Sequence, residues 1–130
     1  MRKIIIITTI VLLAVVVPAK GNLPAGIATA FKSGNADKVA TYFEATVEMA
    51  IDGKRTMYSK AQATQVLSDF FKANKPSNLV EKHNGGSGNS QFSVFTFSSN
   101  SSKFRATIFY KGKDNDLRIS KVNIEKDTGF

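Results

Sequence analysis

The alternation of apolar and polar residues after position 90 predicts three consecutive β-strands. These strands are residues 91–98, 103–111 and 117–125, and short polar turns separate them. Links this short cannot make the crossover that parallel neighbours require, so we expect an antiparallel meander. The middle strand alternates cleanly, which predicts one face toward a core and one face away from it.

The two outer strands of this meander change phase along their length. In the first strand the apolar residues switch faces between residues 94 and 95, and in the third they switch near residues 120–121. A switch within a strand indicates either a β-bulge or a sheet that is buried on both faces. We therefore predict bulges near residues 94–95 and 120–121, which would curl the sheet into a cone with an open mouth.

A curled sheet would also carry apolar residues on the face that points away from the cone. Phe109, together with Phe95 or Phe97, is a candidate for such a position. An exposed apolar patch of this kind is typical of protein–protein contacts, and it would support a homodimer.

The clearest helix of the chain is predicted over residues 59–74. Ser59 and Gln62 form a capping box, in which each side chain satisfies a backbone N–H group of the other residue. Apolar residues then recur at helical spacing: they are Ala63, Val66, Leu67, Phe70 and Phe71. Pro76 ends the helix. The apolar stripe must face the sheet, because burying each large apolar side chain contributes roughly 1.5–3 kcal/mol.

Two short helices are predicted before this long one. Asn22 is the expected cap of the first helix, with Pro24 in its opening turn and Gly34 as its stop. The second helix begins at Asn35 or Asp37. Together they form a helical hairpin with one aromatic face.

Shorter strands complete the predicted sheet. Residues 46–52 and 54–58 form a hairpin, because Asp52–Gly53 is a dipeptide favoured by type I′ turns. Residues 79–83 predict a further strand, and the glycine-rich residues 84–90 predict a flexible connection. Neither a lysine nor a helix follows these glycines, so they do not match a phosphate-binding loop.

The N-terminus has the pattern of a secretory signal peptide over residues 1–19. A short basic region precedes an apolar run, and small residues lead to a cleavage site after Ala19. An uncleaved membrane anchor is the alternative, but it needs about 20 apolar residues, and Pro18 and Lys20 end this run early. We therefore expect an exported bacterial domain of residues 20–130, periplasmic or secreted, with membrane contact only through the transient signal peptide.

The composition excludes several kinds of chemistry. The chain has no Cys and a single His. Thiol catalysis, cysteine-based metal sites and a lipoprotein anchor are therefore excluded, and one imidazole argues against a zinc site. We expect no metal and no cofactor.

The basic charge is spread along the chain. Removing Arg2 and Lys3 from the 18 basic residues leaves 16 against 10 acidic residues, a net charge of +6. A nucleic-acid binder concentrates its charge on one face beside stacking aromatic residues. We therefore expect a basic soluble surface and no nucleic-acid partner, with weak attraction to anionic polymers as the alternative.

The order of helix, helix, hairpin, helix and four strands resembles the NTF2-like (cystatin-like α+β) superfamily. It is most similar to a small exported bacterial family, DUF4783, a domain of unknown function. The segments that carry the resemblance are residues 23–43, which end in Tyr42–Phe43, and residues 47–52, 59–71, 91–98, 104–111 and 117–125. The resemblance implies an α+β fold in which a curved antiparallel sheet wraps around a long helix, with an N-terminal helical hairpin. It also implies a conical pocket and dimerisation through the sheet.

Enzymatic relatives in this superfamily place an Asp/His or Asp/Tyr set inside the cone, and no such motif can be carried over here. Asp52 lies in a turn and Asp69 falls on the polar side of its helix. The acids that could point inward are Glu44, Glu48 and Glu81.

Two functions of different classes follow from this pattern. The leading hypothesis is a non-catalytic exported domain that binds a small apolar ligand or a protein partner through its pocket or sheet face, as a homodimer. The alternative is an isomerase or hydratase that uses His83 with Tyr42, Tyr58 or Tyr110 as acid and base. This enzymatic alternative requires the His83 side chain to face the cavity rather than to lie exposed at a strand end. A basic adhesin for anionic polymers is a third reading, which rests on the net charge alone.

Overall fold

The computed structural model describes residues 23–128. The predicted signal peptide and the predicted Asn22 cap lie outside this range. In chain order the elements are α1 (Ala25–Lys32), α2 (Ala36–Ala40), β1 (Phe43–Ile51), β2 (Lys54–Ser59), α3 (Lys60–Ala73), β3 (Ser77–Ser87), β4 (Ser90–Ser99), β5 (Ser102–Lys111), the 3-10 turn η1 (Asp114–Asp116) and β6 (Arg118–Lys126). None of the helices within these residues is long and apolar enough to cross a membrane.

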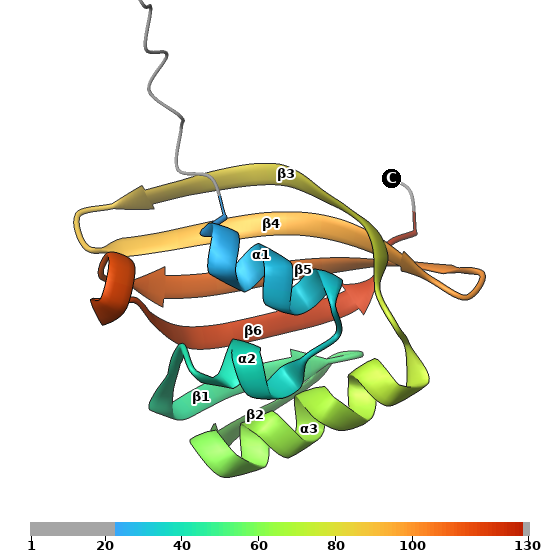
Figure 1. The fold of residues 1–130 in the computed structure, drawn as a ribbon, viewed down its shortest axis with the longest axis horizontal. Helices are drawn as coiled ribbons and strands as arrows, with labels where there is room; N and C mark the ends of the chain where they lie inside the picture. The colour runs from blue at the N-terminus through green and yellow to red at the C-terminus, as the bar shows by residue number, and fades with distance from the viewer. Residues whose placement is uncertain (1–22, 129–130) are drawn as a thin grey trace, which may run out of the picture.

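The six strands form one curved, open sheet in the order β2-β1-β6-β5-β4-β3. The three helices lie on one face of this sheet (Figure 1). The predicted meander is confirmed, because β4, β5 and β6 pair antiparallel with their neighbours along the chain. The sheet as a whole is mixed rather than antiparallel, since β1 pairs with β6 in parallel. These two strands are far apart in sequence, so the chain between them is long enough for a parallel pairing.

One of the two predicted bulges is confirmed. Phe109 of β5 pairs with Lys121 of β6, and Tyr110 pairs with Ile119, so Ser120 is an extra residue between them. The sequence signal for this bulge was the change of phase along β6.

The bulge predicted in β4 is wrong. Val94 and Phe95 pair with β5 without interruption, and the irregularity lies in the opposite strand. There Glu81 pairs with Phe95 and His83 pairs with Val94, which leaves Lys82 as the extra residue of β3. β4 therefore keeps its phase and carries apolar residues on both faces: Phe95 and Phe97 are buried, whereas Phe92 and Val94 are half-buried on the face that no helix covers. The second explanation, burial on both faces, holds only in part.

Local signals in the sequence specify several turns and caps. Ser59 and Gln62 form the predicted capping box of α3. Asp52 and Gly53 both have positive φ angles, 52° and 84°, as a type I′ turn requires. The side chain of Asn35 caps α2 by accepting a hydrogen bond from the Lys38 N–H group.

Two local predictions need correction. Pro24 is the cap of α1 rather than a residue of its first turn. The glycine-rich residues 84–90 do not form a flexible connection, because β3 continues through Ser87 and β4 begins at Ser90. Pairing with β4 keeps this segment extended.

A cluster of phenylalanine side chains fills the space between the helices and the sheet at one end of the molecule. The rings of Phe31 and Phe95 have centroids 5.0 Å apart, and those of Phe70 and Phe104 are 5.3 Å apart, both in edge-to-face contact. Phe97 is also fully buried in this cluster. Phe95 and Phe97 therefore belong to the core, and the expectation that they share the outer face with Phe109 is wrong for both.

Candidate functional site

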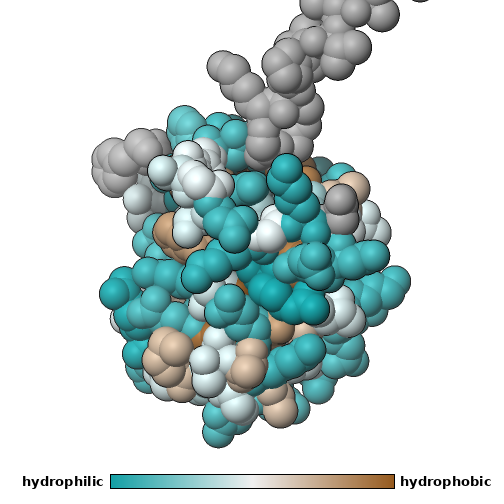
Figure 2. Space-filling model, turned by 90° about the vertical axis from the view of Figure 1, so that its left-hand side faces the viewer, coloured by the Kyte–Doolittle hydropathy of each residue, from teal (hydrophilic) through white to brown (hydrophobic). Residues whose placement is uncertain are grey.

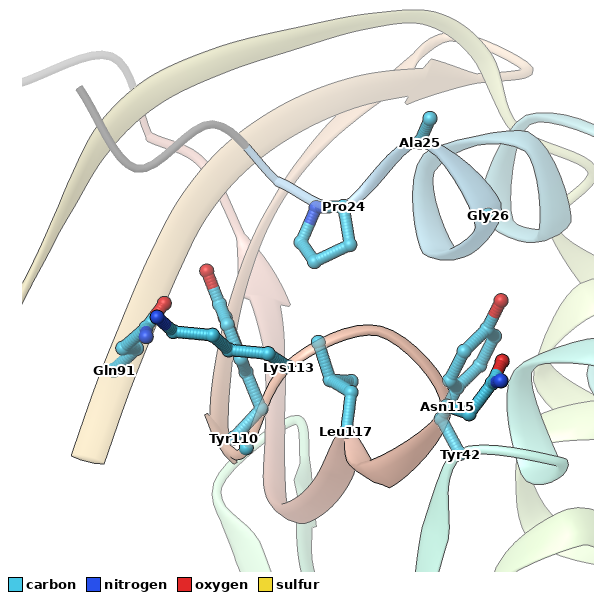
Figure 3. Close-up of a pocket in the computed structure, with 10 residues that line it drawn as sticks. Pro24, Ala25, Gly26, Tyr42, Gln91, Tyr110, Lys113, Asn115 and Leu117 are labelled. Carbon is cyan, nitrogen blue, oxygen red and sulfur yellow. The ribbon is translucent and has the colours of Figure 1, made fainter. Parts of the chain in front are cut away.

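The inner face of β4 changes from aromatic to polar along its length. Phe97, Phe95, Ser93 and Gln91 alternate along the strand, and the first three are buried. The aromatic core therefore ends at Ser93. Beyond it lies a pocket of about 640 Å³ between the start of α1 and the loop that joins β5 to β6 (Figure 3). Its lining residues are Pro24, Ala25, Gly26, Tyr42, Gln91, Tyr110, Gly112, Lys113, Asn115 and Leu117.

The loop between β5 and β6 forms one wall of this pocket, and its shape is fixed by its own residues. Gly112 has a φ angle of 82°, and a side chain there would collide with the Asp116 carbonyl group. The Arg118 guanidinium donates hydrogen bonds to the carbonyl oxygens of Asn115 and Leu117, at 3.2 and 2.7 Å. These contacts hold the loop in a defined conformation beneath α1.

Tyr42 forms a second wall, at the junction between α2 and β1. Its carbonyl oxygen accepts a hydrogen bond of 2.6 Å from the Ile119 N–H group, which fixes the backbone against β6. The half-buried side chain reaches α1, where its hydroxyl lies against Gly26. A side chain at position 26 would overlap this hydroxyl, so the close approach depends on glycine.

Tyr110 and Ser93 meet at the base of the pocket. Their hydroxyl oxygens are 3.1 Å apart, and the two residues are 2% and 0% exposed. Figure 3 shows the Tyr110 ring extending alongside β4, on the side of the pocket opposite Tyr42. Because each hydroxyl carries one proton, the bond between them uses one proton and leaves the other free to be donated.

The rim of the pocket is polar. Gln91 and Asn115 contribute amide groups, and Lys113 is the one charged residue among the described side chains that line it. Figure 2 shows the end of the molecule at which η1 lies, and this surface is mostly hydrophilic with small apolar areas. The pocket is thus a partly apolar cavity with hydroxyl, amide and ammonium donors around it.

Comparison with known proteins places this fold in a family. A family model described as "Domain of unknown function (DUF4783)" matches residues 24–125. The chain belongs to the DUF4783 family. Among curated proteins, none matches the chain significantly.

Solved structures agree with this assignment. A DUF4783 family protein from Bacteroides ovatus is 31% identical, with a TM-score of 0.76, over 82% of this chain and 96% of that one. Another from Bacteroides fragilis is 27% identical, with a TM-score of 0.75, over 82% of this chain and 100% of that one. An NTF2-like protein of unknown function from Silicibacter pomeroyi is 12% identical, with a TM-score of 0.54, over 76% and 85% of the two chains, and shows a shared fold. The resemblance to NTF2-like proteins and to DUF4783 is confirmed.

In this DUF4783 domain the sequence-predicted acid–base residues are dispersed. Tyr42 and Tyr110 line the pocket. Tyr58 instead lines a separate groove of about 260 Å³ between the β1–β2 hairpin and α3. His83 is exposed on β3 and lines neither space. The structure therefore does not bring His83 to the pocket tyrosines.

Of the acidic residues that were expected to point inward, Glu81 lies on the inner face of the sheet. Glu81 accepts hydrogen bonds from the Leu23 N–H group at 2.8 Å and from the Asn84 amide at 3.2 Å, which ties the start of the domain to β3. Glu48 lies on the outer face, where it pairs with Arg55 and Lys121 at 3.4 Å each. Its expected inward position is wrong, because the register of β1 places it beside outer-face residues.

The other three acids named from the sequence lie away from the pocket lining. Glu44 is half-buried on β1. Asp52 lies in the β1–β2 turn, and the exposed Asp69 accepts a hydrogen bond from Gln65 within α3, both as the sequence indicated. None of these three is a described lining residue of the pocket.

The sequence analysis did not identify the lining residue Gln91 or the buried Ser93 beneath the pocket, nor the lining residues Lys113 and Asn115. The alternation along β4 was a signal for the first two, because they share a face with Phe95 and Phe97. The loop residues had no comparable signal, since their role depends on contact with α1.

Proposed function

We propose that this DUF4783 domain is an exported, non-catalytic binding domain that holds a small organic ligand in the pocket between α1 and the β5–β6 loop. The observation that supports the proposal is a cavity of about 640 Å³ above a solid aromatic core. Small-molecule sites are typically clefts of roughly 300–1,000 Å³ with a few fixed polar groups. Tyr42, Tyr110 and Lys113 supply such groups here.

The chemistry of the lining favours binding over proton transfer. General acid–base catalysis uses a side chain, most often His and also Asp, Glu, Lys or Tyr, that transfers a proton within hydrogen-bond reach of the substrate. The described lining offers phenols, amides and one ammonium, and His83 lies exposed outside it. The Tyr110 hydroxyl is already bonded to Ser93, which suits a role in orienting a ligand.

A neutral fluorescent probe, N-phenyl-1-naphthylamine, tests the proposal on the purified protein. We expect one probe per chain, with enhanced fluorescence, and we expect Asn115→Trp to reduce its affinity at least fivefold by filling the pocket. Asn89→Trp is the matched control, because Asn89 is also an exposed loop asparagine but lies in the β3–β4 turn. Absence of binding, or equal binding by the two variants, would overturn the proposal.

We also propose that the outer face of the sheet binds a second copy of this chain. Three large apolar residues are exposed in the described part of the chain: Met57, Val80 and Phe109. The strand registers place all three on the face opposite the helices. Charges of both signs lie among them, including Glu48 and Lys121. A two-fold dimer needs a self-complementary patch of this kind.

A further inference from the structure

We propose that the pocket ligand is an organic acid with an apolar body, and that Lys113 recognises its acidic group. This inference rests on the proposed binding function and specifies the class of ligand. It is drawn from the charge of the pocket lining, the position of Lys113 and the hydroxyl proton that the Ser93–Tyr110 bond leaves over.

Lys113 is placed to meet a ligand at the rim. It follows Gly112 in the loop whose shape Arg118 fixes. Figure 3 shows its side chain extended from the loop toward Gln91 of β4, across the pocket opening. No ion pair joins its ammonium to a carboxylate among the described side chains. Among the described side chains, none supplies a counter-charge to this ammonium, and a ligand acid would do so.

The described lining carries one positive charge and no carboxylate. A cationic ligand would therefore be repelled by Lys113 without compensation, whereas an anionic ligand gains a charge-assisted hydrogen bond. The amides of Gln91 and Asn115 add N–H donors to the lining, together with their carbonyl acceptors. The rim thus favours acceptor oxygens.

The base of the pocket also holds a hydroxyl proton that is not used in the bond between Ser93 and Tyr110. Of the two hydroxyl protons at Ser93 and Tyr110, one remains after their mutual bond forms. The geometry allows either hydroxyl to donate in this bond. When Ser93 donates, the Tyr110 O–H group is free to donate toward a ligand, because Tyr110 lines the pocket. The apolar body of the ligand would lie against Pro24, Leu117 and the tyrosine rings.

Two dyes with the same ring system test this inference. One is 8-anilinonaphthalene-1-sulfonate, which is anionic, and the other is N-phenyl-1-naphthylamine, which lacks the sulfonate. We expect the anionic dye to bind more tightly to the purified protein. We expect Lys113→Gln to weaken the anionic dye about fivefold and to change the affinity of the neutral dye less than twofold. Lys111→Gln is the matched control, because Lys111 is exposed on β5 and lies outside the pocket lining.

The outcomes separate this inference from the binding function. If the anionic dye binds no more tightly than the neutral one, or if both lysine variants weaken it equally, the acid specificity is wrong. In either case the binding function stands as long as Asn115→Trp still reduces binding of the neutral dye. If neither dye responds to Asn115→Trp, the binding function itself fails.

Discussion

The Lys121 ammonium lies 5.3 Å from the centre of the Phe109 ring, on the face of the sheet that the helices leave uncovered. The same ammonium pairs with Glu48 at 3.4 Å, and the Phe109 ring lies 6.1 Å from the ring of Phe92. A row of contacting side chains therefore runs across β1, β6, β5 and β4. Phe109 is held on two sides and still 37% exposed, so it is a fixed apolar residue available to a partner.

This arrangement predicts that Phe109→Glu weakens the proposed homodimer. A carboxylate at the centre of the patch would meet its own copy across the two-fold axis, while Lys121 would still give it a partner within the monomer. We expect the dimer dissociation constant to rise at least tenfold, as for a central apolar contact. Sedimentation velocity over a range of protein concentrations measures this change.

The control for this experiment is Ala61→Glu, which adds the same charge at an exposed position of α3. We expect Ala61→Glu to give the same distribution of monomer and dimer as the wild type in sedimentation velocity. A wild-type protein that stays monomeric at every concentration would exclude the dimer, and a dimer that persists in Phe109→Glu would place the interface elsewhere.

The buried pair at the base of the pocket makes a prediction about stability. Tyr110→Phe leaves the Ser93 hydroxyl buried without its partner, which we expect to lower the free energy of unfolding by about 1–2 kcal/mol. Ser93→Ala should also destabilise the protein, but the double variant should lose less than the sum, with a coupling of about 1 kcal/mol. Urea denaturation of the four proteins gives the coupling directly.

Tyr58→Phe provides the comparison, because Tyr58 is only half-buried in its groove. It should change stability by less than about 0.5 kcal/mol. Additive losses from Ser93→Ala and Tyr110→Phe would show that their hydrogen bond contributes nothing to the folded state.

The N-terminal pattern predicts processing after Ala19. When the full chain is expressed in a bacterium, we expect the intact mass of the accumulated protein to equal that of residues 20–130. Arg2→Asp with Lys3→Asp should impair export, because it removes the positive region of the signal peptide. A protein that keeps residues 1–19 and fractionates with the membrane would favour the uncleaved anchor.

The elements that could be predicted from the sequence are those whose signal is local. The Ser59 capping box and the Asp52–Gly53 turn are specified by residues within four positions of each other. The Ser120 bulge was detectable because Ile119 and Val122, three residues apart, are both buried in the core, which a strand of regular alternation does not allow.

The alternation of β4 could not be resolved from the sequence in the same way. A strand with Phe92 on its outer face and Phe95 in the core reads as a change of phase. Only its pairing with β3 and β5 separates the two explanations. The pocket could not be predicted from the sequence, because its lining combines Pro24 with Lys113, which is nearly the whole domain away in sequence.

Contact between Gly26 and Tyr42 makes a prediction that links α1 to the pocket. In an ordinary helix, Gly→Ala stabilises by about 1 kcal/mol. At position 26 the added methyl group would overlap the Tyr42 hydroxyl, which must then move. We therefore expect Gly26→Ala alone to give no net gain in the free energy of unfolding, and to weaken binding of N-phenyl-1-naphthylamine because the pocket wall shifts.

In the Tyr42→Phe background, the stabilising effect of Gly26→Ala on helix α1 should become measurable. Tyr42→Phe removes the oxygen atom nearest to the added methyl group and leaves the ring Cζ atom 3.2 Å away. The effect of Gly26→Ala on the free energy of unfolding should therefore be more favourable in this background than in the wild type, by about 0.5–1 kcal/mol. The difference between the two backgrounds, measured by urea denaturation, reports the clash itself. If Gly26→Ala stabilises the wild type as much as it stabilises Tyr42→Phe, Tyr42 does not pack against α1 and this wall of the pocket is not fixed.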